Sequence, residues 1–85
     1  MEVTDVRIKA IDNQGSLKAV ATITIDAVFV VHDLKVIDGE GGIFVAMPSK
    51  KAEDNKYRDI AHPINLETRQ YIQSKVLEAY EKMME

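Results

Sequence analysis

The feature that most constrains this chain is an alternation of apolar and polar side chains in two neighbouring segments near its N-terminus. Residues 3–11 place Val6 and Ile8 on one face and charged side chains on the other, and residues 17–25 repeat the alternation. A period of two residues is typical of a strand with one buried face. Residues 12–15, Asp-Asn-Gln-Gly, include types that tolerate the positive φ of a tight turn. The two segments therefore predict an antiparallel hairpin.

Three further extended segments follow the hairpin. Residues 27–37 are apolar on both faces in their first half, so this strand is expected to be central in its sheet or covered from outside the chain. Residues 38–42, Asp-Gly-Glu-Gly-Gly, indicate a turn, and residues 43–47 predict a short strand that ends at a proline. Residues 56–62 predict a short fifth strand, because the residue before Pro63 is pushed away from helical geometry.

The last segment predicts a long helix. Asn65 is a favourable N-cap, Glu67 suits the positive end of the helix dipole, and no Gly or Pro follows. Apolar side chains recur near helical spacing, so one face of the helix is expected to cover the sheet. The apolar positions of the helix are Leu66, Ile72, Val76, Ala79, Tyr80 and Met83, and Phe29, Phe44, Tyr71 and Tyr80 are expected mostly in the core. The alternative for Tyr71, which falls beside the apolar stripe, is an exposed ring that stacks on a base together with Tyr57.

Together these segments predict one α+β domain over residues 1–85, an antiparallel sheet of four to five strands with a C-terminal helix packed on it. A chain of 85 residues buries only somewhat more than ~60% of its unfolded surface on folding. Self-association adds buried surface, and the strand over residues 28–37 would otherwise expose Phe29 or Val31. We therefore expect a homodimer.

Composition narrows the class of protein. The chain has no cysteine, which excludes disulfides and thiolate zinc sites. The acidic N-terminal residues are unlike a signal peptide and no segment approaches membrane-spanning length, so we expect a cytoplasmic protein without membrane insertion. The net charge of −3 argues against a basic coat over the whole surface, so contact with nucleic acid would need a local basic patch.

Two pairings of histidine with aspartate are the only patterns that suggest catalysis or metal binding. His32 and Asp33 are adjacent in a predicted strand, so they are expected to point to opposite faces. His62 follows Asp59 by three residues, but two histidines without cysteine are too few for a closed structural zinc site. No serine stands in a nucleophile-elbow context. We therefore expect no enzyme activity, no metal and no cofactor.

A charged excursion between the fourth strand and the helix is the strongest candidate for function. Its acidic residues partly offset its basic ones, so a solvated loop explains the composition equally well. The chain then returns to Asn65, where the N–H groups of the helix start, the positive end of its dipole and Arg69 form an anion site. Basic loop residues beside this site would extend it along a phosphate backbone. The basic residues of the excursion are Lys50, Lys51, Lys56 and Arg58.

Four stretches of the chain also point to a family. FVVHDLKVIDG, GIFVAMPSK, YRDIAHPIN and TRQYIQ, in this order and spacing, resemble the stage V sporulation protein G (SpoVG) family of bacterial septation and sporulation regulators. The resemblance covers nearly the whole chain. It implies a small α+β homodimer without a cofactor that binds nucleic acid, DNA or RNA, and acts on gene expression affecting septation, sporulation or virulence.

The resemblance implies roles for particular residues. Basic residues directly after the MPS motif contact nucleic acid, and here these are Lys50 and Lys51. Sequence preference is associated with the start of the helix, which here comprises Thr68, Arg69, Gln70, Tyr71, Ile72 and Gln73. Of these, Arg69, Gln70 and Gln73 can form paired hydrogen bonds with base edges. The structural alternative is that Arg69 packs its stem on the sheet and pairs with Asp59 or Glu67.

Two functions of different classes remain open. The first is a homodimeric nucleic-acid-binding regulator that uses the basic loop and the helix start. The second is a protein-interaction module of the division machinery, with septation proteins as partners and no direct role for nucleic acid. Salt separates them, because phosphate binding weakens steeply as salt rises whereas an apolar protein interface changes little.

Overall fold

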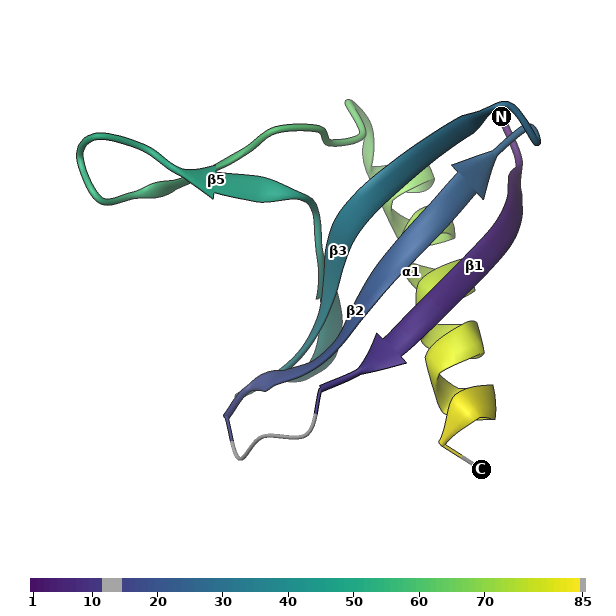
Figure 1. The fold of residues 1–85 in the computed structure, drawn as a ribbon, viewed down its shortest axis with the longest axis horizontal. Helices are drawn as coiled ribbons and strands as arrows, with labels where there is room; N and C mark the ends of the chain where they lie inside the picture. The colour runs from purple at the N-terminus through teal and green to yellow at the C-terminus, as the bar shows by residue number, and fades with distance from the viewer. Residues whose placement is uncertain (12–14, 85) are drawn as a thin grey trace.

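The computed structural model describes residues 1–11 and 15–84, which form six strands and one helix (Figure 1). Most of the predicted turn at residues 12–15 lies outside the described residues. The elements are β1 (Val3–Ala10), β2 (Leu17–Ile25), β3 (Phe29–Gly39), β4 (Gly42–Ala46), β5 (Ser49–Lys51), β6 (Tyr57–Asp59) and α1 (Leu66–Met83).

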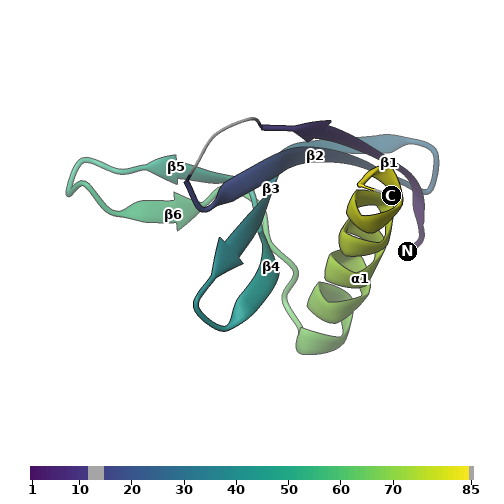
Figure 2. The same cartoon turned by 90° about the horizontal axis from the view of Figure 1, so that it is seen from below.

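The first four strands form an antiparallel sheet in the order β1-β2-β3-β4, and α1 lies against one face of it (Figure 2). The α+β class, the four-stranded sheet and the C-terminal helix are therefore confirmed. Val6 lies opposite Ile23 and Ile8 opposite Ala21 in the β1-β2 pairing. Directly opposite residues point to the same side of a sheet. The alternation seen in the sequence thus sets the buried face of this hairpin.

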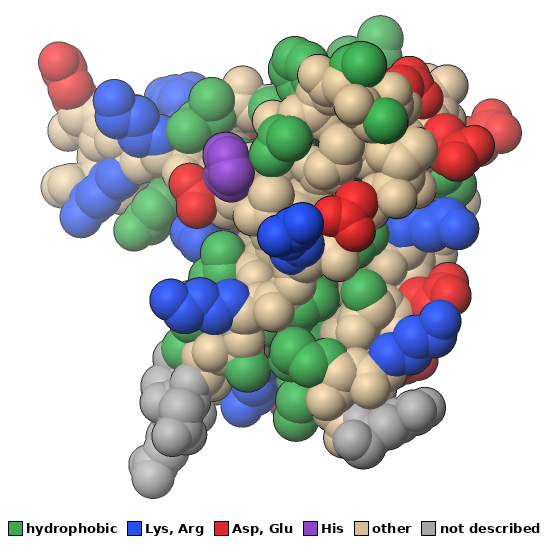
Figure 3. Space-filling view, turned by 45° about the vertical axis from the view of Figure 1, so that its right-hand side comes forward, with side chains coloured by type: hydrophobic (Ala, Val, Ile, Leu, Met, Phe, Trp, Pro, Cys, Tyr) green, Lys and Arg blue, Asp and Glu red, His purple; other side chains and the backbone are tan. Residues whose placement is uncertain are grey.

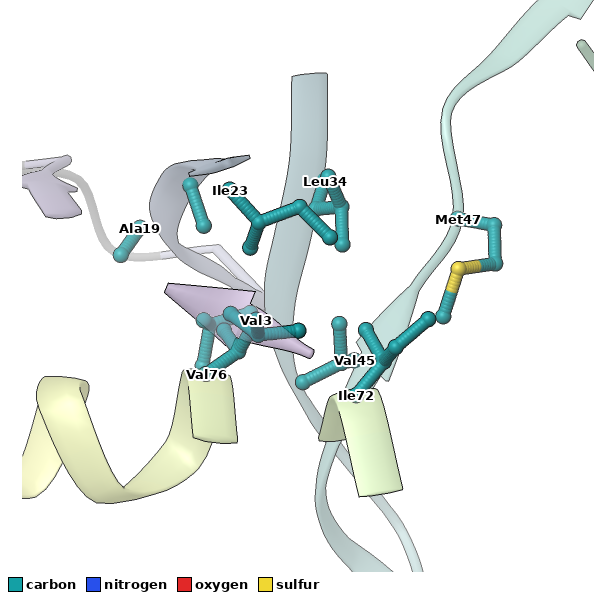
Figure 4. Close-up of a cluster of buried hydrophobic side chains, with 10 residues drawn as sticks. Val3, Ala19, Ile23, Leu34, Val45, Met47, Ile72 and Val76 are labelled. Carbon is teal, nitrogen blue, oxygen red and sulfur yellow. The ribbon is translucent and has the colours of Figure 1, made fainter. Parts of the chain in front are cut away.

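The hydrophobic core lies between that face and the middle of α1 (Figure 4). The backbone N–H of Val3 donates to the hydroxyl oxygen of Tyr71 at 3.0 Å, which ties the start of β1 to the helix. The prediction that Leu66 and Met83 belong to the buried face is wrong, because both stand in terminal turns of α1 and are exposed. The buried apolar side chains are Val3, Ala19, Ala21, Ile23, Leu34, Val36, Val45, Met47, Ile72 and Val76.

The central strand β3 is interrupted by a bulge. Ala21 pairs with Leu34, but Ile23 pairs with Val31, so β3 carries one residue more than β2 across this step. Asp33 has a φ of 66°, and a residue in this left-handed region often marks the extra position of a bulge. Bulges bend a strand and increase its twist. The two halves of β3 therefore run in different directions.

The two halves of β3 also differ in their neighbours. The pairing with β4 covers only the second half of β3, from Lys35 to Gly39, because β4 is short. The expectation of a central strand is thus correct only for that half. Phe29 and Phe44 are exposed, so their expected place in the core is wrong. Phe29 lies in the half that β4 does not reach, and the ring of Phe44 lies over Gly39 instead of the core.

The predicted fifth strand does not join the main sheet. Tyr57–Asp59 forms β6, which pairs with β5 as a separate antiparallel hairpin. Residues 49–59, hereafter the arm, project away from the sheet and helix in both ribbon views (Figures 1 and 2). The backbone N–H of Ile60 donates to the carbonyl oxygen of Pro48 at 2.7 Å and closes the base of the arm. The chain leaves the sheet at Pro48 and pairs with itself.

Candidate nucleic-acid interface

The arm places its basic side chains on both of its faces. Lys50 lies opposite Arg58 and Lys51 opposite Tyr57, so each pair shares one face of the hairpin. All four side chains are exposed. The sequence predicts a loop at Lys50 and Lys51, but both residues belong to β5, so their backbones are held by β6. A strand alternates its side chains, and this directs the two lysines to opposite sides of the arm.

The turn at the tip of the arm is held by its own polar groups. The N–H of Ala52 donates to the carbonyl oxygen of Lys56 at 2.8 Å, and Asn55 adopts a φ of 63°. One carboxylate oxygen of Asp54 accepts from the N–H of Lys56 at 3.2 Å, and the other lies 2.9 Å from Nη2 of Arg58. Asp54 therefore acts as both a turn residue and the partner of Arg58.

The charge of the arm is only partly neutralised. Both side chains of the Arg58–Asp54 pair are exposed to solvent, and exposed ion pairs contribute little stability. The Arg58 guanidinium can therefore exchange Asp54 for another anion at a small cost in free energy. Lys50, Lys51 and Lys56 form no ion pair with any residue in the described parts of the chain. In Figure 3, Lys and Arg side chains gather over the arm at the upper left of the view. The arm thus presents ammonium groups that remain available for an anion.

The helix start has the geometry that its sequence predicts. Asn65 has an extended backbone, with φ −145° and ψ 159°, and its Oδ1 accepts from the N–H of Thr68 at 2.7 Å. Glu67 lies in the first turn, where its negative charge interacts favourably with the positive end of the helix dipole. The side chain of Thr68 is half-buried and borders an apolar hollow, so this residue faces the protein more than solvent.

The three predicted base-reading side chains differ in their surroundings. Gln70 is exposed. Arg69 is half-buried, and within residues 1–11 and 15–84 its guanidinium forms no ion pair, so the predicted alternative pairing with Asp59 or Glu67 is not formed. Gln73 is also half-buried, and its Oε1 accepts from the N–H of Val45 at 3.4 Å. Gln73 therefore satisfies an outer-edge amide of β4, a structural role that its position in the sequence gave no signal for.

The arm and the helix start form two separate groups. Residues 60–65 connect them, and the arm extends away from α1 in both ribbon views. The structure therefore does not bring the arm lysines of one chain against its own Arg69 and Gln70. An extended anion such as a phosphate backbone is needed to contact both groups at once.

Comparison with known proteins identifies the family of this chain. The sequence profile of the SpoVG family matches residues 1–82. The chain belongs to the SpoVG family. It is 58% identical over 85 residues to the "putative septation protein SpoVG" of Agathobacter rectalis, covering 100% of this chain and 98% of that one. It is 61% identical over 82 residues to the protein of the same name from Lachnospira eligens, covering 96% and 93% of the two chains.

A third SpoVG protein, from Acetivibrio thermocellus, is 58% identical over 83 residues, covering 98% of this chain and 88% of its own length. Both candidate groups lie inside the part that matches the SpoVG profile, so neither is an addition to the family's domain. No cluster of three His, Cys, Asp or Glu side chains that could hold a metal ion occurs in the described parts of this SpoVG chain. Its helix, across the residues that the structure describes, is not apolar enough to cross a membrane.

Proposed function

We propose that this SpoVG-family protein is a non-enzymatic regulator that binds nucleic acid as a homodimer and influences gene expression in septation and sporulation. The observation that carries the proposal is the arm, a self-paired hairpin that stands clear of the body and exposes Lys50 and Lys51, neither of which forms an ion pair with a described residue. A two-stranded ribbon fits the major groove of B-DNA. Its lysines neutralise phosphates without reading the bases, so the arm supplies affinity.

The helix start supplies the groups that can read sequence. Arg69 and Gln70 keep unpaired polar side chains in the described structure, and arginine suits guanine whereas glutamine suits adenine. Gln73 contributes less to reading in this proposal, because its carbonyl oxygen is engaged by β4. The proposal therefore divides the interface into a clamp on the arm and a reader on the helix.

A second candidate function has its own support. Val28, Phe29 and Val30 are exposed, and an exposed apolar surface of this kind marks a protein interface. A protein-interaction module of the septation machinery would use this surface, and the related proteins are named for septation. The two functions differ in their response to salt.

An electrophoretic titration of the wild type against duplex DNA and duplex RNA, at roughly 50 and 200 mM salt, separates the two functions. We expect saturable binding that weakens steeply at the higher salt, because bound phosphates release counterions. Comparison of the two duplexes shows which nucleic acid is preferred. Absence of binding at the lower salt would remove the nucleic-acid function and leave the protein-interaction module.

Replacing Arg69 by alanine is expected to relax sequence discrimination. Discrimination between a preferred and a scrambled duplex should fall by roughly 1–3 kcal/mol, while the melting temperature stays unchanged. Arg7→Ala is the control, since it removes the same charge from an exposed arginine on β1. If Arg69→Ala lowers the melting temperature and leaves discrimination intact, then Arg69 is structural and the helix start is not the reader.

A further inference from the structure

The main sheet has an outer face, which is turned away from α1 (Figures 1 and 2). A strand turns successive side chains to opposite faces, so residues beside a buried position point outward. Val36 and Val45 are buried in the core under α1, and their neighbours Lys35 and Phe44 therefore lie on the outer face. Neither the arm nor the helix start belongs to this face, because the arm forms a separate sheet.

The ring of Phe44 lies over a glycine on the outer face. Gly39 stands next to the partner of Phe44 in the β3–β4 register, on the same side of the sheet. A side chain at residue 39 would place its Cβ 2.9 Å from Cε1 of Phe44, so the ring occupies the space that this side chain would need. Phe44 nevertheless remains 43% exposed. A ring held against the sheet in this way can stack with a base, because every base has a π-face.

A second ring stands on the same face in β3. His32 is exposed, and its Nδ1 lies 3.4 Å from the hydroxyl oxygen of Thr22 on the neighbouring strand β2. Thr22 alternates with buried residues of β2, so this contact places the imidazole on the outer face. Along β3, Lys35 stands between His32 and the position opposite Phe44. The outer face thus carries a ring, a lysine and a second ring in this order.

Two lysines give the outer face a free positive charge. The register across β1, β2 and β3 places Lys9 and Lys35 in one row, on either side of Val20. Neither lysine forms an ion pair with any residue that the structure describes. Ammonium groups of this kind neutralise phosphates. The row can therefore hold part of a nucleic-acid backbone beside the two rings.

The other charges of the outer face cancel in pairs. Nε of Arg7 lies 3.1 Å from a carboxylate oxygen of Asp5. Lys18 and Asp33 stand at the two irregular steps of the β2–β3 pairing, and their charges are opposite. The face therefore keeps the positive charge of its row of two lysines, although the whole chain has a net charge of −3. This local charge is complementary to an anionic strand and not to the rest of the chain.

We propose that the outer face of the main sheet binds single-stranded nucleic acid, with bases stacked on Phe44 and His32 and phosphates beside Lys9 and Lys35. Aromatic side chains on an open sheet bind unpaired bases, and nearby cations follow the backbone. The inference goes beyond the duplex interface of the proposed function and shares no residue with it. A change on this face is therefore expected to leave duplex binding unaltered.

The shape of the outer face favours a single strand over a duplex. The bulge at Asp33 turns the two halves of β3 in different directions, so the face bends between His32 and Lys35. Duplex DNA is stiff, with a persistence length of about 50 nm, and its bases are already stacked on one another. A flexible single strand can follow the bend and offer its bases to the rings.

Phe44→Ala tests the proposal with fluorescently labelled strands of dT and rU, each about 12 nucleotides long. Fluorescence anisotropy should show that the variant binds about 5- to 150-fold more weakly than the wild type, the range that one stacked base contributes. His32→Ala should also weaken binding. Phe44→Tyr keeps a ring and should bind as the wild type does. The two strands separate DNA from RNA as the occupant.

Ile43→Ala is the matched control for Phe44→Ala. Ile43 is the adjacent residue of β4 and points to the opposite face, and it is 45% exposed, close to the 43% of Phe44. This control should bind both strands as the wild type does. Circular dichroism checks that every variant is folded. Equal weakening in the two alanine variants would overturn the assignment of the outer face.

The double variant Lys50→Ala and Lys51→Ala separates the outer face from the duplex interface. This variant should lose duplex affinity and keep its affinity for the single strands. A wild type that binds duplex but neither single strand would overturn the inference and leave the proposed regulator intact. Loss of single-strand binding in the double variant, with Phe44→Ala unaffected, would assign the single strand to the arm instead. Single-strand binding that depends on Phe44, without duplex binding, would refute the duplex interface and support this inference.

Discussion

Replacing Lys50 and Lys51 together by alanine is expected to weaken nucleic-acid binding on every sequence alike and to flatten its salt dependence. Each phosphate neutralised on duplex DNA contributes about 0.9 to the slope of log affinity against log salt. If one arm binds, the slope becomes shallower by about 1.8, and if both arms of a dimer bind, by about 3.6. Between roughly 50 and 200 mM salt, the wild type therefore loses about 12-fold or about 150-fold more affinity than the variant.

The control for this prediction is the double variant Lys9→Ala and Lys18→Ala. It lowers the net charge by the same amount but removes lysines from β1 and β2, away from the arm. Its salt slope should match the wild type. An unchanged affinity for the Lys50 and Lys51 variant, with its circular dichroism spectrum intact, would move the phosphate contacts away from the arm.

Leu34→Ala is expected to have the largest effect on stability. Leu34 is fully buried at the end of the bulge and faces α1 across the core. Truncating a buried leucine costs roughly 2–5 kcal/mol, because it combines lost transfer free energy with an unfilled cavity. A domain of this size has a total free energy of unfolding of roughly 5–15 kcal/mol. Chemical denaturation at one fixed protein concentration should therefore show a greatly lowered midpoint.

Ile43→Ala is the matched control for Leu34→Ala. Truncation to alanine removes a similar side-chain volume from isoleucine and from leucine. Both residues stand in strands of the same sheet, but Ile43 is exposed whereas Leu34 is buried. A change at an exposed site is expected to stay within about 0.5 kcal/mol. Equal losses in the two variants would mean that the buried cluster around Leu34 is not the main source of stability.

Local patterns account for most of the main sheet and the helix. The alternation in β1 and β2 sets which side chains are buried, because a strand turns each successive side chain to the opposite face. Asn65 marks the start of α1 because its side chain satisfies a free N–H in the first turn. These relations act between residues close in the chain, so they are visible in the order of the residues.

The pairing of distant segments was less visible. Nothing in residues 49–51 shows that they form a strand, because a segment of three residues has no measurable period and takes its structure from β6. The hydrogen bond from Val45 to Gln73 likewise joins two elements whose distance depends on how α1 crosses the sheet. Both features change the candidate site. The β5–β6 pairing fixes the backbones of Lys50 and Lys51, and the hydrogen bond to Val45 engages Gln73, which the sequence predicts as a base-reading residue.

The composition of the basic patch and the position of the helix start were therefore encoded in short stretches of sequence, where side-chain type and spacing act locally. The tertiary structure decided that the patch is a projecting hairpin, that it stands apart from Arg69, and that the first half of β3 pairs with β2 on one side but with no described strand on the other. Each of these outcomes depends on which strands pair. Strand pairing joins residues far apart in the chain, and its energy comes from hydrogen bonds and burial that exist only once the fold has formed.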